Sequence, residues 1–338
     1  MTQLRSTLFI TGLAFLAVLL WLGLRVLSTG PLANITDQLS NFTTIFLGIF
    51  IEAASFLLLG TLASGLVEAF VNQDDLSRWI PRDPIRGALA GALLGFCFPV
   101  CECGVVPLTR RLFKKGLPLS VGITFLLAAP VFNPIVIAST LAAFGLGPVL
   151  FLRLGLTLII ATVTGLVFAA QPRPERLLLP TAWVPISGAS GATSVTFVRP
   201  TLRAGLRLAL TVAVDEFFEM GRYLVVGSLL AAFMQTLIPQ SALLTVSAGP
   251  VVSVLTLIAL AVILSICSTV DAFIALAFAG TFTTGSILAF LVFGPMVDIK
   301  STLMFLGVFR RRTVTYLILL PLLMTILAGV VINLNASW

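Results

Sequence analysis

Two thiols flank a carboxylate in the most distinctive local pattern of the sequence, Cys101-Glu102-Cys103. Pro99 and Pro107 lie in the same apolar segment. Prolines break the helical hydrogen-bond ladder, which leaves backbone polar groups free to bind a ligand. Glu102 is the only charged residue of that segment, and such a group is costly to bury without a partner or a function. We therefore predict that Cys101, Glu102 and Cys103 bind a substrate. Alternatively, Glu102 is solvated at an interface and the cysteines act as small apolar residues.

A related pattern occurs in the second half of the chain. Cys267, Ser268 and Asp271 follow one another within an apolar stretch. Their side chains could line a path or coordinate a cation, which makes them further candidates for substrate binding. In the alternative interpretation, the hydroxyl groups bond to the backbone of their own helix.

Polar residues next to prolines mark two more interruptions. Asn133 lies between Pro130 and Pro134, and Asp298 and Lys300 follow Pro295. A proline-flanked asparagine can offer its amide group to a ligand, and Asp298 and Lys300 could pair or gate a path. Each could instead cap a helix end at an interface.

Three charged residues in long apolar helices are candidates for proton transfer or for ion pairs, namely Glu52, Glu219 and Arg222. Glu219 and Arg222 are three positions apart and would share a helix face, so they could neutralise each other. Proton-coupled transport would use such carboxylates, but a structural ion pair explains them equally well.

These residues must be positioned by helices that lie in lipid. Of the 338 residues, 59% are hydrophobic and 10% charged, and uncharged runs of about the length that spans a bilayer recur along the chain. We predict an all-α, multi-pass protein of the inner (plasma) membrane with about eight to ten transmembrane helices, some broken or re-entrant, the first at residues 7–27.

The net charge of +7 indicates cytoplasmic loops, as at Arg110 to Lys115 and Arg310 to Arg312, rather than nucleic-acid binding. Four cysteines without histidine argue against a disulfide framework or a zinc site, and we predict no metal and no cofactor.

The two halves share landmarks at an offset of about 165 residues. Glu52 precedes Gly60 by eight positions, as Glu219 precedes Gly227. We predict an N-terminal helix and loop at 1–40, a first membrane repeat at 41–170, a flexible, cytoplasmic linker at 171–204 and a second membrane repeat at 205–338. The basic loops exchange sides between the halves, which predicts inverted repeats with a binding site at their junction.

Four motifs together resemble the predicted permease family that includes the organoarsenical efflux permease ArsP and the YraQ-like proteins. They begin at Pro99 (Pro-Val-Cys-Glu-Cys-Gly-Val-Val-Pro), Ala129 (Ala-Pro-Val-Phe-Asn-Pro), Cys267 (Cys-Ser-Thr-Val-Asp-Ala-Phe) and Phe290 (Phe-Leu-Val-Phe-Gly-Pro-Met-Val-Asp-Ile-Lys). The resemblance implies a permease, with export of trivalent organoarsenicals as the best-known activity of the family. Soft thiolates suit such a substrate, and Cys101 or Cys103 meeting Cys267 would supply exchangeable ligands.

Two other functions stay open. One is a permease for another small ion or solute, in which the cysteines only pack. The other is a membrane thiol redox protein, although such dithiols usually occur as Cys-x-x-Cys. We therefore predict a transporter rather than an enzyme. Its expected partners are the lipid bilayer and a small-molecule or ion substrate, with a homo-oligomer left open.

Overall fold

The computed structural model describes residues 32–72, 81, 83–98, 100–170, 177–179, 201–237 and 249–335, with side chains from residue 38 onward. Those parts of the chain are almost entirely helical, as predicted, and their β-structure is one bridge between Leu178 and Phe309. The predicted span at 7–27 and most of the loop at 73–82 lie outside the described residues.

Helices follow one another in the same order in the two halves. The first half contains α2 (Leu32–Phe70), α4 (Pro84–Cys97), α5 (Glu102–Lys114), α6 (Leu119–Phe132), α7 (Pro134–Phe144) and α8 (Pro148–Ala169). The second contains α10 (Leu202–Leu237), α12 (Pro250–Leu264), α13 (Asp271–Phe278), α14 (Thr284–Met296), α15 (Ile299–Val308) and α16 (Arg311–Asn335). Among the described residues, a long helix comes first in each half and five shorter ones follow. A repeated unit would produce this order, and the two repeats and their inversion stay predictions.

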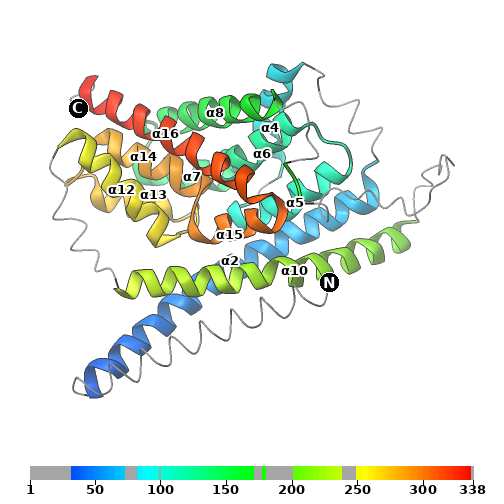
Figure 1. Cartoon of the computed structure of the whole chain (residues 1–338), viewed down its shortest axis with the longest axis horizontal. Helices are drawn as coiled ribbons and strands as arrows, with labels where there is room; N and C mark the ends of the chain where they lie inside the picture. The colour runs from blue at the N-terminus through cyan, green and yellow to red at the C-terminus, as the bar shows by residue number, and fades with distance from the viewer. Residues whose placement is uncertain are drawn as a thin grey trace.

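The two long helices, α2 and α10, lie side by side along one edge of the molecule (Figure 1). Glycine allows them to approach their neighbours closely. A Cβ atom on Gly60 of α2 would lie 2.3 Å from the Cα of Gly104 in α5, and one on Gly227 of α10 would lie 2.9 Å from the Cα of Lys300 in α15. Gly60 and Gly227, two of the shared landmarks in the sequence, thus hold the long helices against the elements that carry Cys103 and Lys300.

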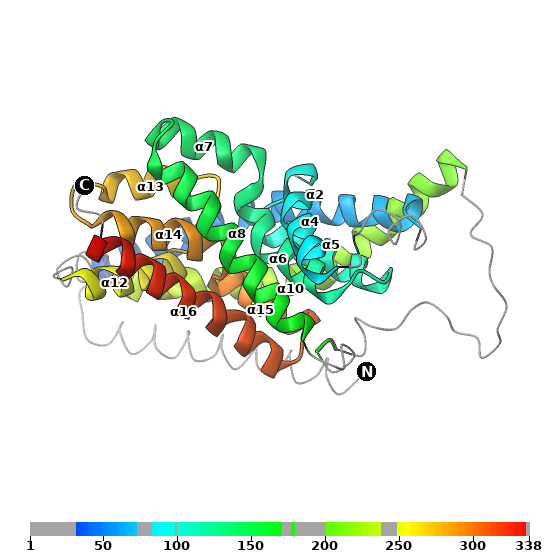
Figure 2. The same ribbon diagram turned by 90° about the horizontal axis from the view of Figure 1, so that it is seen from above.

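The shorter helices form a packed body beside this pair. In the first half α6 packs between α4 and α8, and in the second half α14 packs between α12 and α16 (Figures 1 and 2). The halves also contact each other directly, since α15 packs against α5 and α13 packs against α7. The starts of α5 and α15 are thereby brought to one place.

Short breaks divide the helices of this body at the polar motifs. Helices α6 and α7 meet at Asn133 with a bend of 42°. The next residue is Pro134, and a residue before proline avoids the helical conformation, so Asn133 is extended, with φ −66° and ψ 129°. Helix α12 ends at Leu264, and its C-cap residue Ser265 has a positive φ of 45°. The predicted interruption at Asn133 is confirmed, and the break after Leu264 is one that the sequence did not predict.

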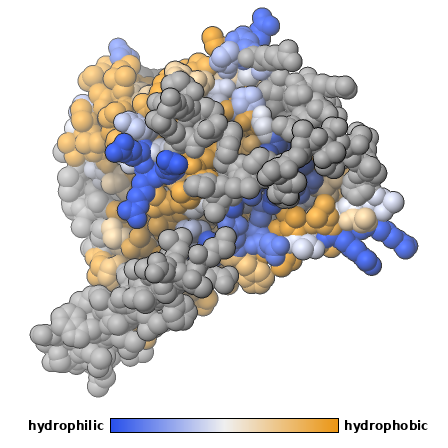
Figure 3. Space-filling view, turned by 45° about the vertical axis from the view of Figure 1, so that its right-hand side comes forward, coloured by the Kyte–Doolittle hydropathy of each residue, from blue (hydrophilic) through white to orange (hydrophobic). Residues whose placement is uncertain are grey.

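Five helical segments of the described residues are long and apolar enough to cross a membrane, and the bent pair of α6 and α7 makes a sixth. Helices α4 and α12 are apolar but reach only 14 and 15 residues, so they are not among these six. The predicted span at 7–27 lies outside the described residues, and the total of eight to ten stays a prediction. Large apolar side chains remain exposed on α2, α10 and α16, for example Ile51, Phe218 and Leu323. Hydrophobic residues accordingly cover much of the visible surface in Figure 3. The chain is therefore an all-α, multi-pass membrane protein.

Three residues of the predicted linker are tied to the second half. The amide of Leu179 donates to the carbonyl of Val308 at 3.0 Å, and the amide of Arg310 donates to the carbonyl of Leu177 at 3.0 Å. Leu178 between them is buried. These backbone bonds and the burial of Leu178 hold residues 177–179 beside the α15–α16 junction, and the linker itself stays a prediction. Most of the remaining linker lies outside the described residues.

Candidate functional site

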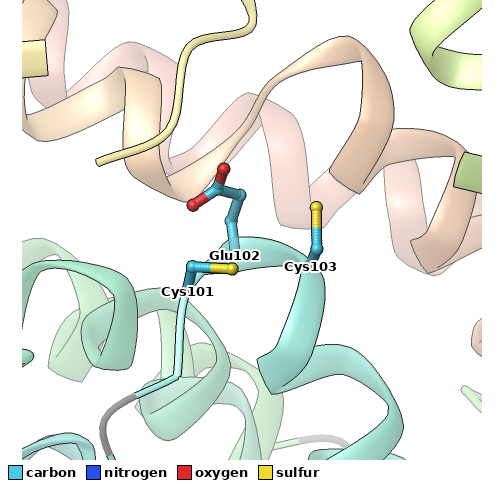
Figure 4. Close-up of side chains that lie close together, drawn as sticks. All are labelled: Cys101, Glu102 and Cys103. Atoms are coloured by element: carbon cyan, nitrogen blue, oxygen red, sulfur yellow. The ribbon is translucent and has the colours of Figure 1, made fainter. Parts of the chain in front are cut away.

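The first half contributes the start of α5 to the candidate site. Cys101 is the N-cap residue of this helix, with an extended backbone, and Glu102 and Cys103 form its first turn. All three side chains are buried, and their sulfur and carboxylate atoms lie within 4.8 Å of one another. In Figure 4 the side chains of Glu102 and Cys103 point away from their own helix, toward the ribbon of the second half. A guest at this point would meet thiols and a carboxylate together.

The second half contributes the loop between α12 and α13. Cys267 is buried in this loop, and its thiol interacts with the thiol of Cys101. The thiol of Cys101 also interacts with that of Cys103, which lies within 4.8 Å. Three thiols from distant parts of the sequence therefore meet, and Cys101 is the one that contacts both others. Cys97, in contrast, is exposed at the end of α4.

Charged and polar groups lie beside the thiols. The Nζ atom of Lys300 lies 3.7 Å from Oε1 of Glu102 and 3.5 Å from Oδ2 of Asp298, and all three side chains are at most 3% exposed. These distances are longer than the roughly 2.8 Å of a strong charged hydrogen bond, so the ammonium group is shared loosely between two carboxylates. Ser268 Oγ lies 3.5 Å from Oε2 of Glu102. Glu52, on α2, acts electrostatically on Cys267.

Asp298 and Asn133 both cap helices that begin at breaks. Asp298 accepts a hydrogen bond from the amide of Ser301 at 2.6 Å, and the Ser301 hydroxyl accepts one from the Asp298 amide at 2.9 Å, which is a capping box. Asn133 accepts from the amide of Ile135 at 3.0 Å. Both side chains can form a further hydrogen bond, because Nδ2 of Asn133 and Oδ2 of Asp298 are buried without a hydrogen-bond partner. Buried polar atoms of this kind are uncommon and are typical of sites that receive a ligand or water.

Asp271 lies apart from these groups in an ion pair of its own. Arg153 of α8 binds its carboxylate through two hydrogen bonds, of 3.1 Å and 2.6 Å, and also donates to the hydroxyl of Thr140 in α7 at 2.7 Å. Arg153 and Asp271 are almost completely buried. The carboxylate that we expected to line a path is therefore neutralised by an arginine and joins the two halves.

Glu219 pairs with a distant residue rather than with a neighbour. Its Oε2 atom lies 2.7 Å from Nη1 of Arg110 in α5. The guanidinium of Arg222 lies over the ring of Tyr223 instead, 5.0 Å from its centroid. The predicted Glu219–Arg222 pair is thus replaced by a contact between α10 and α5, because the buried Arg110 needs a counter-ion more than the exposed Arg222 does.

Arg111 completes a buried network at the same end of α5. It forms an ion pair with Glu216 and lies 3.5 Å from Glu68, while Ser64 donates a hydrogen bond to Glu216. Lys115 donates to the carbonyls of Glu68 and Val71, at 3.0 Å and 2.6 Å. The basic run that we assigned to a loop therefore lies largely on a helix, and its arginines hold α2, α5 and α10 together.

Arg153, Arg111 and Glu216 are the structural residues that our candidate set omits. One signal was available in the sequence, because a lone arginine in the apolar stretch of residues 148–169 requires a buried counter-ion and Asp271 is a lone acid in similar surroundings. The identity of the partner depends on how α8 packs against α13, and sequence spacing does not reveal that.

Comparisons with known proteins agree on one family. The chain is 43% identical over 287 residues to "UPF0718 protein YcgR" of Bacillus subtilis (strain 168), covering 85% of this chain and 94% of the relative. It is 37% identical over 269 residues to a Streptococcus mutans protein named "Putative two-component membrane permease complex subunit", covering 79% and 87%. No solved structure matches. A family model described as "Predicted permease" matches residues 38–334, and the chain therefore belongs to this family of membrane permeases.

Proposed function

We propose that this permease exports a small, soft, thiol-reactive solute, with trivalent organoarsenicals as the leading class, across the inner membrane. The observation that carries the proposal is the meeting of Cys101, Cys103 and Cys267 in a buried cluster. Trivalent arsenic is thiophilic, and a thiol cluster within a permease gives such a solute a place to bind and to leave. Cys101 and Cys267 lie in breaks between helices, and Cys103 lies in the first turn of α5.

The surroundings of the thiols support a guest of modest size. Lys300 is not drawn into a tight pair, and one oxygen of Asp298 has no hydrogen-bond partner. A guest that carries hydroxyl groups would satisfy these atoms. We further propose that the matching order of helices reflects two inverted repeats, with this cluster as the midplane site at their junction.

Uptake of methylarsenous acid into everted membrane vesicles tests the proposal. We expect Cys101→Ser to reduce uptake at least tenfold, because Cys101 contacts both other thiols. The matched control is Cys97→Ser, since this thiol is exposed on α4 and lies outside the cluster. Equal uptake by wild type and Cys101→Ser would refute the role of the thiols.

A second candidate substrate is another small ion or polar solute. Oδ2 of Asp298 and Nδ2 of Asn133 favour it, because they are buried without a hydrogen-bond partner and would bind such a solute without any thiol. Transport of the natural substrate by a variant without cysteines, combined with its loss in Asp298→Asn, would support this alternative over the thiol-reactive solute.

A further inference from the structure

Cys101 holds a central position among the three thiols. Its thiol interacts with the thiol of Cys103, two residues further along the same half, and with the thiol of Cys267 of the other half. Cys101, Glu102 and Cys103 form a compact group within 4.8 Å, and Cys267 reaches that group through Cys101. The cluster therefore contains two thiol pairs that share one member.

We infer that the guest is handed from one pair to the other, between Cys101–Cys103 and Cys101–Cys267, without leaving Cys101. The inference rests on the proposed function and adds to it a path within the site. The ligand is of the class already proposed: a trivalent centre with one organic group and two exchangeable hydroxyl groups, such as methylarsenous acid. Such a centre engages two thiols at a time and leaves the third free to attack.

The chemistry of loading requires no oxidant. Two S–H bonds and two As–O bonds break, two As–S bonds form, and two water molecules leave. Arsenic stays trivalent throughout. Loading is reversible by the same route, so water can release the solute on the other side of the site.

The transfer step is balanced as well. The sulfur of Cys267 forms a bond to arsenic while the bond from arsenic to the sulfur of Cys103 breaks, so the number of As–S bonds is unchanged. One proton leaves Cys267, and one proton is taken up by Cys103. Glu102 is placed to carry it, because its carboxylate interacts electrostatically with both of these thiols. The bond to Cys101 persists, and the solute stays anchored during the exchange.

The fold explains why such an exchange would move the solute. Cys103 belongs to α5, which is held against α2 by the contact between Gly60 and Gly104, whereas Cys267 belongs to the loop between α12 and α13. When Cys267 replaces Cys103 as a ligand, the solute thus becomes bound to the second half as well as to Cys101. Where one half rocks against the other, a solute bound to the second half would move with that half.

Binding and transport should respond differently to single substitutions. The probe for binding is phenylarsine oxide added to purified protein, with bound arsenic counted by mass spectrometry. Cys103→Ser and Cys267→Ser each keep one complete pair and should bind the probe within about tenfold of wild type. Cys101→Ser breaks both pairs and should bind at least about 100-fold more weakly, because the advantage of two linked ligands is lost. In vesicles, all three variants should lose transport of methylarsenous acid.

Several outcomes would overturn the handover. Wild-type transport by Cys103→Ser or Cys267→Ser would show that one pair is enough, and tight binding by Cys101→Ser would remove its central role. Loss of binding in all three variants would indicate a single three-thiol site. If wild-type protein neither binds nor transports the arsenicals, the proposed function itself fails, and the handover fails with it.

A measurement on wild-type protein tests the same inference without any variant, so that poor folding of a variant does not affect the result. Wild-type protein is given less than one equivalent of phenylarsine oxide, its free thiols are alkylated, and the protected cysteines are identified by mass spectrometry. We expect Cys101 to be protected in every loaded molecule, with Cys103 and Cys267 each protected in a fraction of them. Full protection of one partner and none of the other would contradict the exchange.

Discussion

The buried pair of Arg153 and Asp271 offers the sharpest test of how the two halves are held together. Two hydrogen bonds, of 3.1 Å and 2.6 Å, join the side chains, which are only 1% and 4% exposed. At about 3 Å and an effective dielectric constant of about 20, the Coulomb attraction is about 5 kcal/mol. Removing one partner leaves the other charge buried, so Arg153→Met or Asp271→Leu should each lower the free energy of unfolding by about 3–5 kcal/mol.

The double variant separates a structural role from a binding role. Arg153→Met combined with Asp271→Leu leaves no unpaired charge, and Thr140 keeps its hydrogen bond to the carbonyl of Val136 at 2.7 Å. We therefore expect the double variant to recover most of the lost stability, measured as unfolding of purified protein in mixed detergent micelles. It should also retain binding of phenylarsine oxide.

An exposed ion pair is the matched control for this experiment. Arg86 and Asp83 lie 3.6 Å apart with side chains 80% and 51% exposed, and Arg86→Met should cost at most about 1 kcal/mol. The reasoning is refuted if either buried single variant costs less than this control, or if the double variant costs as much as the sum of the two singles.

Two further predictions concern packing and the network around α5. Gly60→Ala would place a Cβ atom 2.3 Å from the Cα of Gly104 and should lower the free energy of unfolding by about 1–3 kcal/mol. In the control Gly48→Ala, on the same helix, the new Cβ atom meets nothing within 4 Å, so this variant should be neutral or slightly stabilising. Equal effects of the two substitutions would contradict the close helix crossing. Arg111→Ala leaves Glu216 without its buried counter-ion and should lower the free energy of unfolding by about 3 kcal/mol. The control is Arg207→Ala, at an exposed position on α10, which should change the free energy of unfolding by less than about 0.5 kcal/mol in the same micelle assay. A neutral Arg111→Ala would show that Glu216 finds another partner.

Local features of the sequence predict the breaks and much of the site. Prolines stand at the first position of α4, α7, α8 and α12, where their missing amide hydrogen is no loss, so helix starts can be read directly. The shared landmarks also indicate that the region of Cys101 and the region of Cys267 belong together. Both predictions rest on backbone chemistry that acts within a few residues.

The partners of the buried charges could not be predicted in the same way. Glu219 has an arginine three positions away, which is sufficient on an isolated helix, yet the fold supplies Arg110 from α5. Asp271 finds Arg153 at a separation of 118 residues. The partner of each buried charge depends on how helices from the two halves pack. The sequence alone is compatible with many different ion pairs.

The length of the long helices links the protein to the thickness of its membrane. The apolar part of α2, Gln38–Phe70, has 33 residues and is about 50 Å long, whereas the hydrocarbon layer measures about 30 Å. Fitting it entirely inside would require a tilt of about 50°, more than membrane helices usually adopt. One end of α2 extends beyond the rest of the body in Figure 1. Lipids with longer or shorter acyl chains will therefore change the inclination of α2, and the backbone contact at Gly60 carries that change directly to the turn that presents Cys103.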